Sequence, residues 1–287
     1  MNLKDSMENN DHRYATYYDA SKGSGMLEFI SRNIREIRVY RHALFNFIST
    51  NLSSRYRRSA FGFLWSLLNP LFTMVIMAVV FSSLYKLPFA EFSLYLFSGL
   101  LPWNLITSSL MGGSMSIILA EGYLKKVYIP KMVFPLVTLG VEIINFLFSL
   151  ISLFVLAFFF GAKIGWSLLV LPFALLLLSL FLLGNILFLS ILTVFFRDMS
   201  HILQIGLLGL FYLTPVIYPI SFLSGRLLTL IKFNPFYYFI SLFHMIIYEA
   251  APPGWFEWLV CLCLTAVSLI LGLVVFQKKE QDVIYRL

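Results

Sequence analysis

The chain of 287 residues is 60% hydrophobic and only 12% charged, whereas soluble domains average about 45–50% and about 25%. This composition excludes a water-soluble globular protein and indicates an integral membrane protein. The net charge of +7 would suit nucleic acid, but the basic residues gather at the edges of apolar runs and not on one polar surface. We therefore expect no nucleic-acid partner.

Residues 1–25 form a polar N-terminal tail without the apolar segment that a secretory signal needs, so we expect no cleavage. An amphipathic helix is predicted over residues 26–50, lying on the cytoplasmic face of the membrane. Its apolar side chains follow helical spacing and are Leu27, Ile30, Ile34, Ile37, Leu44, Phe45 and Ile48. Arg41 falls on the same face, where its long side chain can extend toward headgroups.

A basic elbow then leads into the membrane, so residues 26–66 are predicted to form the interface helix and this elbow. Its landmarks are Arg55, Arg57, Arg58, Gly62 and Trp65, followed by Pro70 and an almost uncharged run. The arginines lie where anionic headgroups are expected, the tryptophan suits the membrane interface, and the glycine permits a bend.

Six apolar runs are long enough to cross a bilayer, which takes about 20 residues. They cover residues 67–85, 92–119, 133–160, 166–195, 202–218 and 256–276. We predict an all-α integral membrane protein with six transmembrane helices in a domain over 67–276. We expect tilt, or breaks at Pro102, Gly112–Gly113, Pro172 and Pro215, to absorb the surplus length.

The basic residues between these runs orient the chain. Of the lysines and arginines, 17 fall on one side of the predicted bundle and 4 on the other. By the positive-inside rule both termini are cytoplasmic, including the tail over 277–287.

The segment 219–255 carries Pro219, Pro235, Pro252 and Pro253 around apolar stretches that are too interrupted for two ordinary spans. Two short re-entrant helices in the outer leaflet are predicted, the second beginning after the breaker Asn234-Pro235. An outer loop resting on the membrane is the alternative.

Chemical signatures are sparse. No G-x-x-x-x-G-K-S/T phosphate loop occurs, so ATP would have to bind another chain. Cys261 and Cys263 lie two apart in an apolar run, where a helix points them in different directions and prevents a disulfide. No metal-ligand spacing surrounds them. Glu142 is the one acid well inside an apolar run. Inserting it into the membrane in the charged form would cost about 2.5–3.5 kcal/mol. Either it has a functional role, or it is neutral or hydrogen-bonded within the fold.

Two cytoplasmic loops are candidate docking points for a partner, or else ordinary connections. The first runs from Glu121 to Lys131 and is charged and aromatic; the second is a compact turn containing Arg197 and Asp198. Near the predicted outer end, Tyr212, Tyr218, Tyr237 and Tyr238 offer aromatic faces and hydroxyl groups that suit sugars. Most of the other aromatic residues, 17% of the chain in all, are expected to pack or to face lipid.

From about residue 41 to the C-terminus the chain resembles the membrane subunits of ABC-2-type polysaccharide exporters, which move O-antigen, capsule or teichoic acid. The matching residues occur in the family's order: Arg55-Tyr56-Arg57-Arg58-Ser59 with Gly62, Trp65 and Pro70; Leu101-Pro102-Trp103; Tyr128-Ile129-Pro130-Lys131; Phe196-Arg197-Asp198; Thr214-Pro215-Val216-Ile217-Tyr218; and Asn234-Pro235. Phe61 departs conservatively from the leucine that members commonly carry, and residues 1–25 have no counterpart.

The resemblance implies a non-catalytic channel subunit in the bacterial cytoplasmic (inner) membrane. Two copies would pair as a homodimer above two copies of a separate ABC ATPase, which would bind ATP and Mg; this chain would hold no cofactor or metal. The coupling residues would be Glu121, Gly122, Tyr123, Leu124, Lys125, Lys126, Tyr128, Lys131, Arg197 and Asp198, with the helix 26–50 also touching the ATPase.

The resemblance also implies a substrate, a polysaccharide on a lipid carrier, with O-antigen favoured over capsule or teichoic acid. Arg55, Arg57 and Arg58 would meet the carrier's anionic headgroup, or else only anchor the chain among membrane lipids. The four tyrosines named above would line the glycan channel or its outer gate.

Other readings remain. An ABC-2 exporter of a small lipid or drug should lack the Arg-Tyr-Arg-Arg segment. A secondary transporter needs intramembrane coupling groups, for which only Glu142 is a candidate. A membrane glycosyltransferase or polymerase needs paired acids, whereas the 219–255 segment offers Arg226, Lys232, His244 and Glu249.

Overall fold

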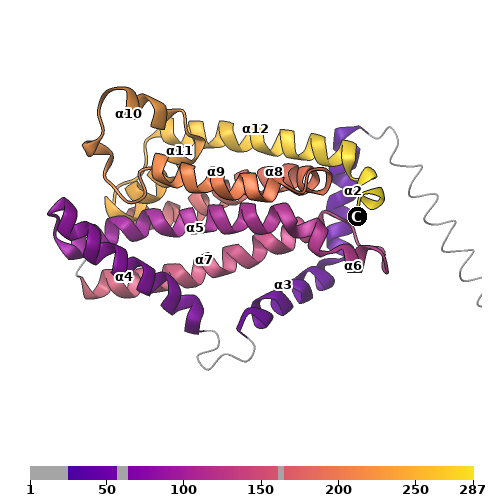
Figure 1. The fold of residues 1–287 in the computed structure, drawn as a ribbon, viewed down its shortest axis with the longest axis horizontal. Helices are drawn as coiled ribbons and strands as arrows, with labels where there is room; N and C mark the ends of the chain where they lie inside the picture. The colour runs from indigo at the N-terminus through magenta and orange to yellow at the C-terminus, as the bar shows by residue number, and fades with distance from the viewer. Residues whose placement is uncertain (1–24, 57–63, 161–164) are drawn as a thin grey trace, which may run out of the picture.

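The computed structural model describes residues 25–56, 64–160 and 165–287. Every regular element in those three ranges is helical, as expected for the all-α class. The long helices run side by side along one axis (Figure 1). Helix α2 (Met26–Val39), helix α6 (Glu121–Leu124) and the C-terminus lie at one end of the bundle, and α10 (Gly225–Lys232) lies at the other. We call these the α6 end and the α10 end.

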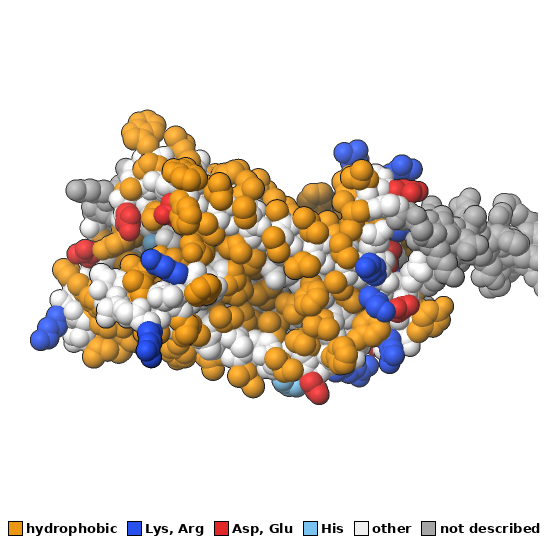
Figure 2. Space-filling model, turned by 90° about the horizontal axis from the view of Figure 1, so that it is seen from above, with side chains coloured by type: hydrophobic (Ala, Val, Ile, Leu, Met, Phe, Trp, Pro, Cys, Tyr) orange, Lys and Arg blue, Asp and Glu red, His pale blue; other side chains and the backbone are white. Residues whose placement is uncertain are grey.

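Five helices in the described part of the chain are long and apolar enough to cross a membrane. They are α4 (Trp65–Tyr85), α5 (Phe89–Leu119), α7 (Val133–Phe159), α8 (Leu171–Phe195), which the short helix η2 (Trp166–Val170) precedes, and α12 (Trp255–Lys279). Hydrophobic side chains dominate the middle of the face in Figure 2, and charged side chains gather toward its two ends. This distribution matches a protein whose middle lies in lipid.

The predicted span over 202–218 is wrong in its bounds. Helix α9 runs from Met199 to Leu213, and 15 residues extend only about 22 Å against a hydrocarbon core of about 30 Å. The residues that follow form a turn, in which the single O–H of Tyr95 on α5 is shared between the carbonyl oxygens of Pro215 and Tyr218, at 3.1 and 2.8 Å.

The segment after this turn contains the two short helices that its prolines predict. After η3 (Ile220–Phe222) come α10 and then α11 (Pro235–Phe243), which continues as η4 (His244–Tyr248). The axes of Gly225–Lys232 and Pro235–Tyr248 meet at 89°. Asn234 begins α11 as predicted, since its side chain accepts a hydrogen bond from the Phe236 amide at 3.0 Å.

The expected helix breaks occur at two of four places. Helix α9 ends just before Pro215, and α8 begins with Pro172 in its first turn. Helix α5 instead continues through Pro102 and through Gly112–Gly113. The glycine pair serves packing, because a Cβ atom on Gly113 would lie 2.5 Å from the Ile186 side chain of α8.

The single helix predicted over 26–50 is in fact two helices, α2 and α3 (Arg41–Tyr56), which separate at Tyr40. Arg41 was the residue that did not fit one continuous apolar face. The break lets each helix bury its own residues. Phe29 of α2 packs with Phe276 and Val283 near the C-terminus, while Leu44 and Ile48 of α3 pack against the start of α7.

Helix α5 is central, packing against α4, α7, α8, α9 and α11. The closest helix contact is between α8 and α12. A Cβ atom on Gly272 would lie 2.1 Å from the Gly184 carbonyl oxygen, which is the close approach that small residues permit between membrane helices. Cys261 and Cys263 are unbonded, as predicted, with Cys261 buried and Cys263 exposed.

Candidate functional site

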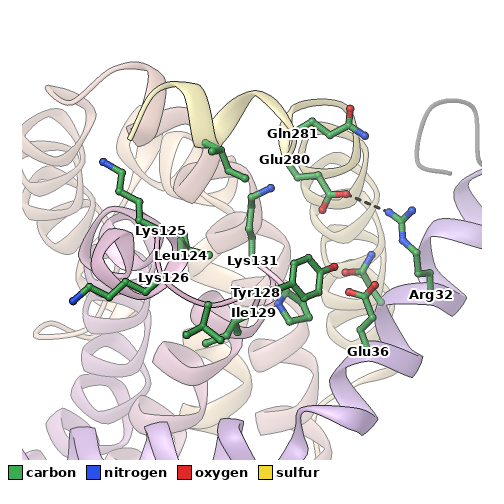
Figure 3. A pocket seen from close by; sticks show the side chains of 14 residues that line it. Arg32, Glu36, Leu124, Lys125, Lys126, Tyr128, Ile129, Lys131, Glu280 and Gln281 are labelled. Carbon is green, nitrogen blue, oxygen red and sulfur yellow. Dashed lines mark hydrogen bonds and ion pairs between the residues drawn. The ribbon is translucent and has the colours of Figure 1, made fainter. Parts of the chain in front are cut away.

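A cavity of about 380 Å³ opens at the α6 end of the bundle. Its walls are α2, the segment from Leu124 to Lys131, and the residues from Glu280 to Ile284 after α12 (Figure 3). The first predicted docking loop therefore packs against both the first described helix and the C-terminal segment.

Charged side chains of both signs line this cavity. Arg32 Nη2 of α2 lies 3.2 Å from Glu280 Oε1, an ion pair with side chains 26% and 17% exposed. Lys131 is also attracted to Glu280. Figure 3 shows Arg32 and Glu36 on α2, Glu280 after α12 and Lys131 on the loop, with Arg32 directed toward Glu280. The carboxylates thus neutralise two cations that are largely withdrawn from water.

Burial changes the pKa values of three of these charged side chains. It raises the pKa of Glu280, against the opposing attraction of Lys131 and Arg32. It also raises the pKa of Glu36, which Arg32 and a hydrogen bond with Tyr128 partly offset. Burial lowers the pKa of Lys131, while Glu280 acts in the opposite direction. A change in the packing of the loop would therefore alter these charges.

Aromatic contacts join the loop to α3 and to Tyr40, the residue between α2 and α3. The rings of Tyr40 and Tyr128 are 6.5 Å apart, and those of Phe47 and Tyr123 are 5.3 Å apart. Movement of α2 or α3 would thus be transmitted to the loop.

The remaining predicted docking residues are on the surface. Lys125, Lys126 and Gly122 are exposed, and Lys125 pairs with Glu121 one turn away. Arg197 and Asp198 are exposed between α8 and α9, and Arg197 is close enough to Glu121 to attract it. The two predicted loops therefore share one surface at the α6 end.

The arginines proposed for the headgroup are only partly covered by the structure. Arg57 and Arg58 lie outside the described residues, as do residues 1–24 of the predicted tail. Arg55 belongs to the last turn of α3, where only its backbone is described.

The four tyrosines predicted at the outer end form two pairs. The Tyr218 hydroxyl donates to the Tyr212 carbonyl at 2.8 Å, and the rings of Tyr237 and Tyr238 lie 5.1 Å apart. Tyr212 is 60% exposed. Asn234 Nδ2 donates to Thr214 Oγ1 at 2.7 Å and so ties the turn after α9 to the start of α11.

Glu142 is buried within α7, and Asn145 Nδ2 donates to its Oε2 at 3.1 Å. No cluster of three His, Cys, Asp or Glu side chains suited to a metal ion occurs within 25–56, 64–160 and 165–287.

Sequence reasoning missed Arg32, Glu36 and Glu280 as members of the site. Arg32 and Glu36 were part of the polar face of an amphipathic helix, and Glu280 was part of a short polar tail. A useful signal was the acid directly after the two lysines that end α12, Lys278 and Lys279, where positive charge is otherwise expected.

Comparison with known proteins adds a family and several relatives. Residues 43–248 match the model of the family described as ABC-2 type transporter. The chain is 30% identical over 254 residues to the O-antigen export system permease protein RfbA of Myxococcus xanthus, covering 88% of this chain and 97% of that protein. Two Klebsiella pneumoniae proteins of the same name are 30% and 28% identical, each match covering 64% of this chain and 72% of the relative.

Proposed function

The chain belongs to the ABC-2 type transporter family, and from that premise we propose that it is the channel-forming membrane subunit of an ATP-driven exporter of a lipid-linked polysaccharide. The observation that carries the proposal is the match to the M. xanthus O-antigen export permease over 97% of that protein's length. O-antigen is accordingly the favoured cargo, ahead of capsule or teichoic acid. The five long apolar helices suit a subunit of this kind.

ATP hydrolysis is assigned to a separate ABC ATPase with its own Mg. Two copies of this chain would form a homodimer above two copies of that ATPase, in the bacterial inner membrane with both termini cytoplasmic. The α6 end would then face the ATPase. In support, both docking loops reach this surface and α2, α3 and the C-terminal segment pack around the first of them.

Closure of the ATPase would press on the segment Glu121 to Lys131. Tyr123 would pass that displacement to α3 through Phe47, and Lys131 would pass it to α12 through Glu280. Arg55, Arg57 and Arg58 would hold the anionic headgroup of the lipid carrier near the start of α4.

The test begins with affinity purification of the chain from its native membrane in mild detergent and identification of partners by mass spectrometry. A co-purifying ATPase in equal amount is expected. Deletion of the gene should leave lipid-linked glycan inside the cell and remove it from the surface. A chain that purifies alone and transports without ATP would contradict the proposal; a partner ATPase with unchanged surface glycan would point to a small lipid or drug.

The coupling role has its own test in the purified complex. Replacing Tyr123 with Ala should leave the complex assembled while export falls relative to ATP consumption. Replacing the exposed Tyr285 with Ala is a matched control, since Tyr285 lies after α12 in η5 (Asp282–Tyr285) and is not among the docking residues.

A further inference from the structure

A second cavity, of about 410 Å³, lies between α4, α5 and α7. It is distinct from the cavity at the α6 end, with which it shares no lining residue. Seven of its twelve lining side chains are polar: Asn69, Thr73, Asn104, Ser108, Glu142, Asn145 and Ser149. So polar a cavity between helices of this apolarity needs an explanation.

The cavity lies at membrane depth. Glu142 comes nine positions after Val133, which begins α7 at the α6 end, and this corresponds to about 14 Å of helix. Polar and ionisable side chains at such depth face the bundle interior or a water-filled path, because lipid cannot satisfy them. Asn104, Ser108 and Thr73 are exposed on the single chain, so this face needs water or other polar groups against it rather than lipid.

One atom in the cavity wall is a buried hydrogen-bond acceptor without a donor. Asn145 uses its Nδ2 to donate to Glu142, but its Oδ1 is buried without a hydrogen-bond partner. Buried acceptors in native structures nearly always have a donor. A hydroxyl group entering the cavity would supply one.

The donors and acceptors of the cavity select the class of ligand. Amide and hydroxyl groups both donate and accept, and a carboxylate accepts. Trp65 adds an aromatic ring at the start of α4. No lysine or arginine is among the described residues that line the cavity, so the wall is ill suited to phosphate. Hydroxyl-rich, uncharged ligands fit it best.

We propose that this cavity binds sugar units of the glycan during their passage, through the hydroxyl groups of the sugars and separately from the lipid carrier's anionic headgroup. This site rests on the proposed function, and it identifies part of the surface that the polymer contacts as it crosses the membrane. Glu142 and Asn145 form its inner surface, and Asn104 and Thr73 form its rim.

Protection of introduced cysteines from a maleimide tests whether the glycan occupies the cavity. Cys261 and Cys263 are first replaced by Ala, and then Thr73→Cys, Asn104→Cys or, as a control in the docking loop, Lys126→Cys is introduced. Inverted membrane vesicles without ATP are treated with a water-soluble maleimide. They come from cells that make the lipid-linked glycan and from cells blocked at its first sugar transfer.

The expected result is severalfold slower labelling at positions 73 and 104 when the glycan is present, with no change at position 126. Equal labelling with and without glycan overturns the proposal. So does a complete lack of labelling at both cavity positions in glycan-free vesicles, because the cavity would then not be open to water.

Export measurements separate this inference from the proposed function. Asn145→Ala should lower the rate of glycan export about three- to tenfold, the loss expected for one hydrogen bond, with the ATPase complex intact. Asn185→Ala is the matched control, since Asn185 is a membrane asparagine bonded within the fold to Phe181 and Ser268. Equal export by Asn145→Ala and wild type, or equal losses in the two variants, overturns the sugar site alone; absence of export by the wild type overturns the proposed function.

Discussion

The imidazole ring of His244 lies parallel to the phenol ring of Tyr95, with centroids 4.3 Å apart and an interplanar angle of 3°. Ser98 Oγ lies 2.7 Å from His244 Nδ1, and His244 Nε2 lies 3.2 Å from the Pro215 carbonyl oxygen. Three segments far apart in sequence, α5, the turn after α9 and η4, therefore meet in one buried polar cluster. This cluster fixes the position of the short helices at the α10 end.

Replacing Tyr95 with Phe should destabilise the protein, because the partly buried carbonyl of Tyr218 loses this donor and the buried carbonyl of Pro215 keeps only its contact with His244 Nε2. The expected cost is about 1–3 kcal/mol, measured as a lower melting temperature in detergent. Tyr248→Phe is the control, since its hydroxyl donates to Glu91 at an exposed position. An unchanged melting temperature in the Tyr95→Phe variant would show that these hydrogen bonds add no stability.

Replacing Gly272 with Ala should prevent the close approach of α12 to α8. The added Cβ atom would meet the Gly184 backbone, which cannot move aside as a flexible side chain can, so a large loss of folded protein is expected by size-exclusion chromatography. In contrast, Gly209→Ala in α9 meets nothing within 4 Å and should be neutral or stabilising by up to about 1 kcal/mol. Tolerance of alanine at position 272 would contradict the observed packing.

Reversing one charge of the Arg32–Glu280 pair should destabilise the α6 end. Arg32→Glu places two carboxylates together, with an expected cost of about 1.5–3 kcal/mol from the lost charged hydrogen bond. Adding Glu280→Arg should restore much of it. The four proteins form a double-mutant cycle in chemical denaturation, and strictly additive effects would mean that the pair does not interact in solution.

Stability should depend on pH through Glu280 and Glu36. Their pKa values are raised in the folded protein by burial, so the folded state holds these protons more tightly than the unfolded state does. The contribution to stability is full below the unfolded-state pKa and is lost as pH rises through the folded-state pKa.

The measurement is the melting temperature against pH for wild type and for a Glu36→Gln, Glu280→Gln double variant. The wild type should lose stability relative to the variant as pH rises from the acidic range. Lys131, whose pKa is lowered, acts oppositely, but only at higher pH. A constant difference between the two proteins across the acidic range would show that neither carboxyl group has a raised pKa.

Hydrophobic length and breakers predicted much of the fold. Helices α4, α5, α7, α8 and α12 occur within a few residues of their predicted spans because an apolar run of sufficient length is a local property of the sequence. The end of α9 was predicted only in part, because Pro215 was expected to break the run although the apolar pattern continues to Tyr218. The turn that follows the helix is held by a contact with Tyr95, 120 or more positions away, which no local pattern shows.

The candidate site was predictable only where its features are local in the sequence. The loop from Glu121 to Lys131 stood out by its charge and aromatic residues. Its partners Arg32 and Glu280 did not stand out, because they form an ion pair only when folding brings them together. The polar face around Glu142 was equally hidden, since its members are spaced along three helices as single polar residues in apolar runs.

Arg32 and Glu280 are 248 positions apart in the chain, and this separation determines when their ion pair can form during biosynthesis. A ribosome makes Arg32 early and Glu280 near the end, so this ion pair cannot form until the last long helix has been synthesised. Until then Lys131 and Arg32 lack the carboxylate that they share, and the surface at the α6 end is incomplete. A nascent chain therefore cannot present this surface to a partner before its membrane domain is finished.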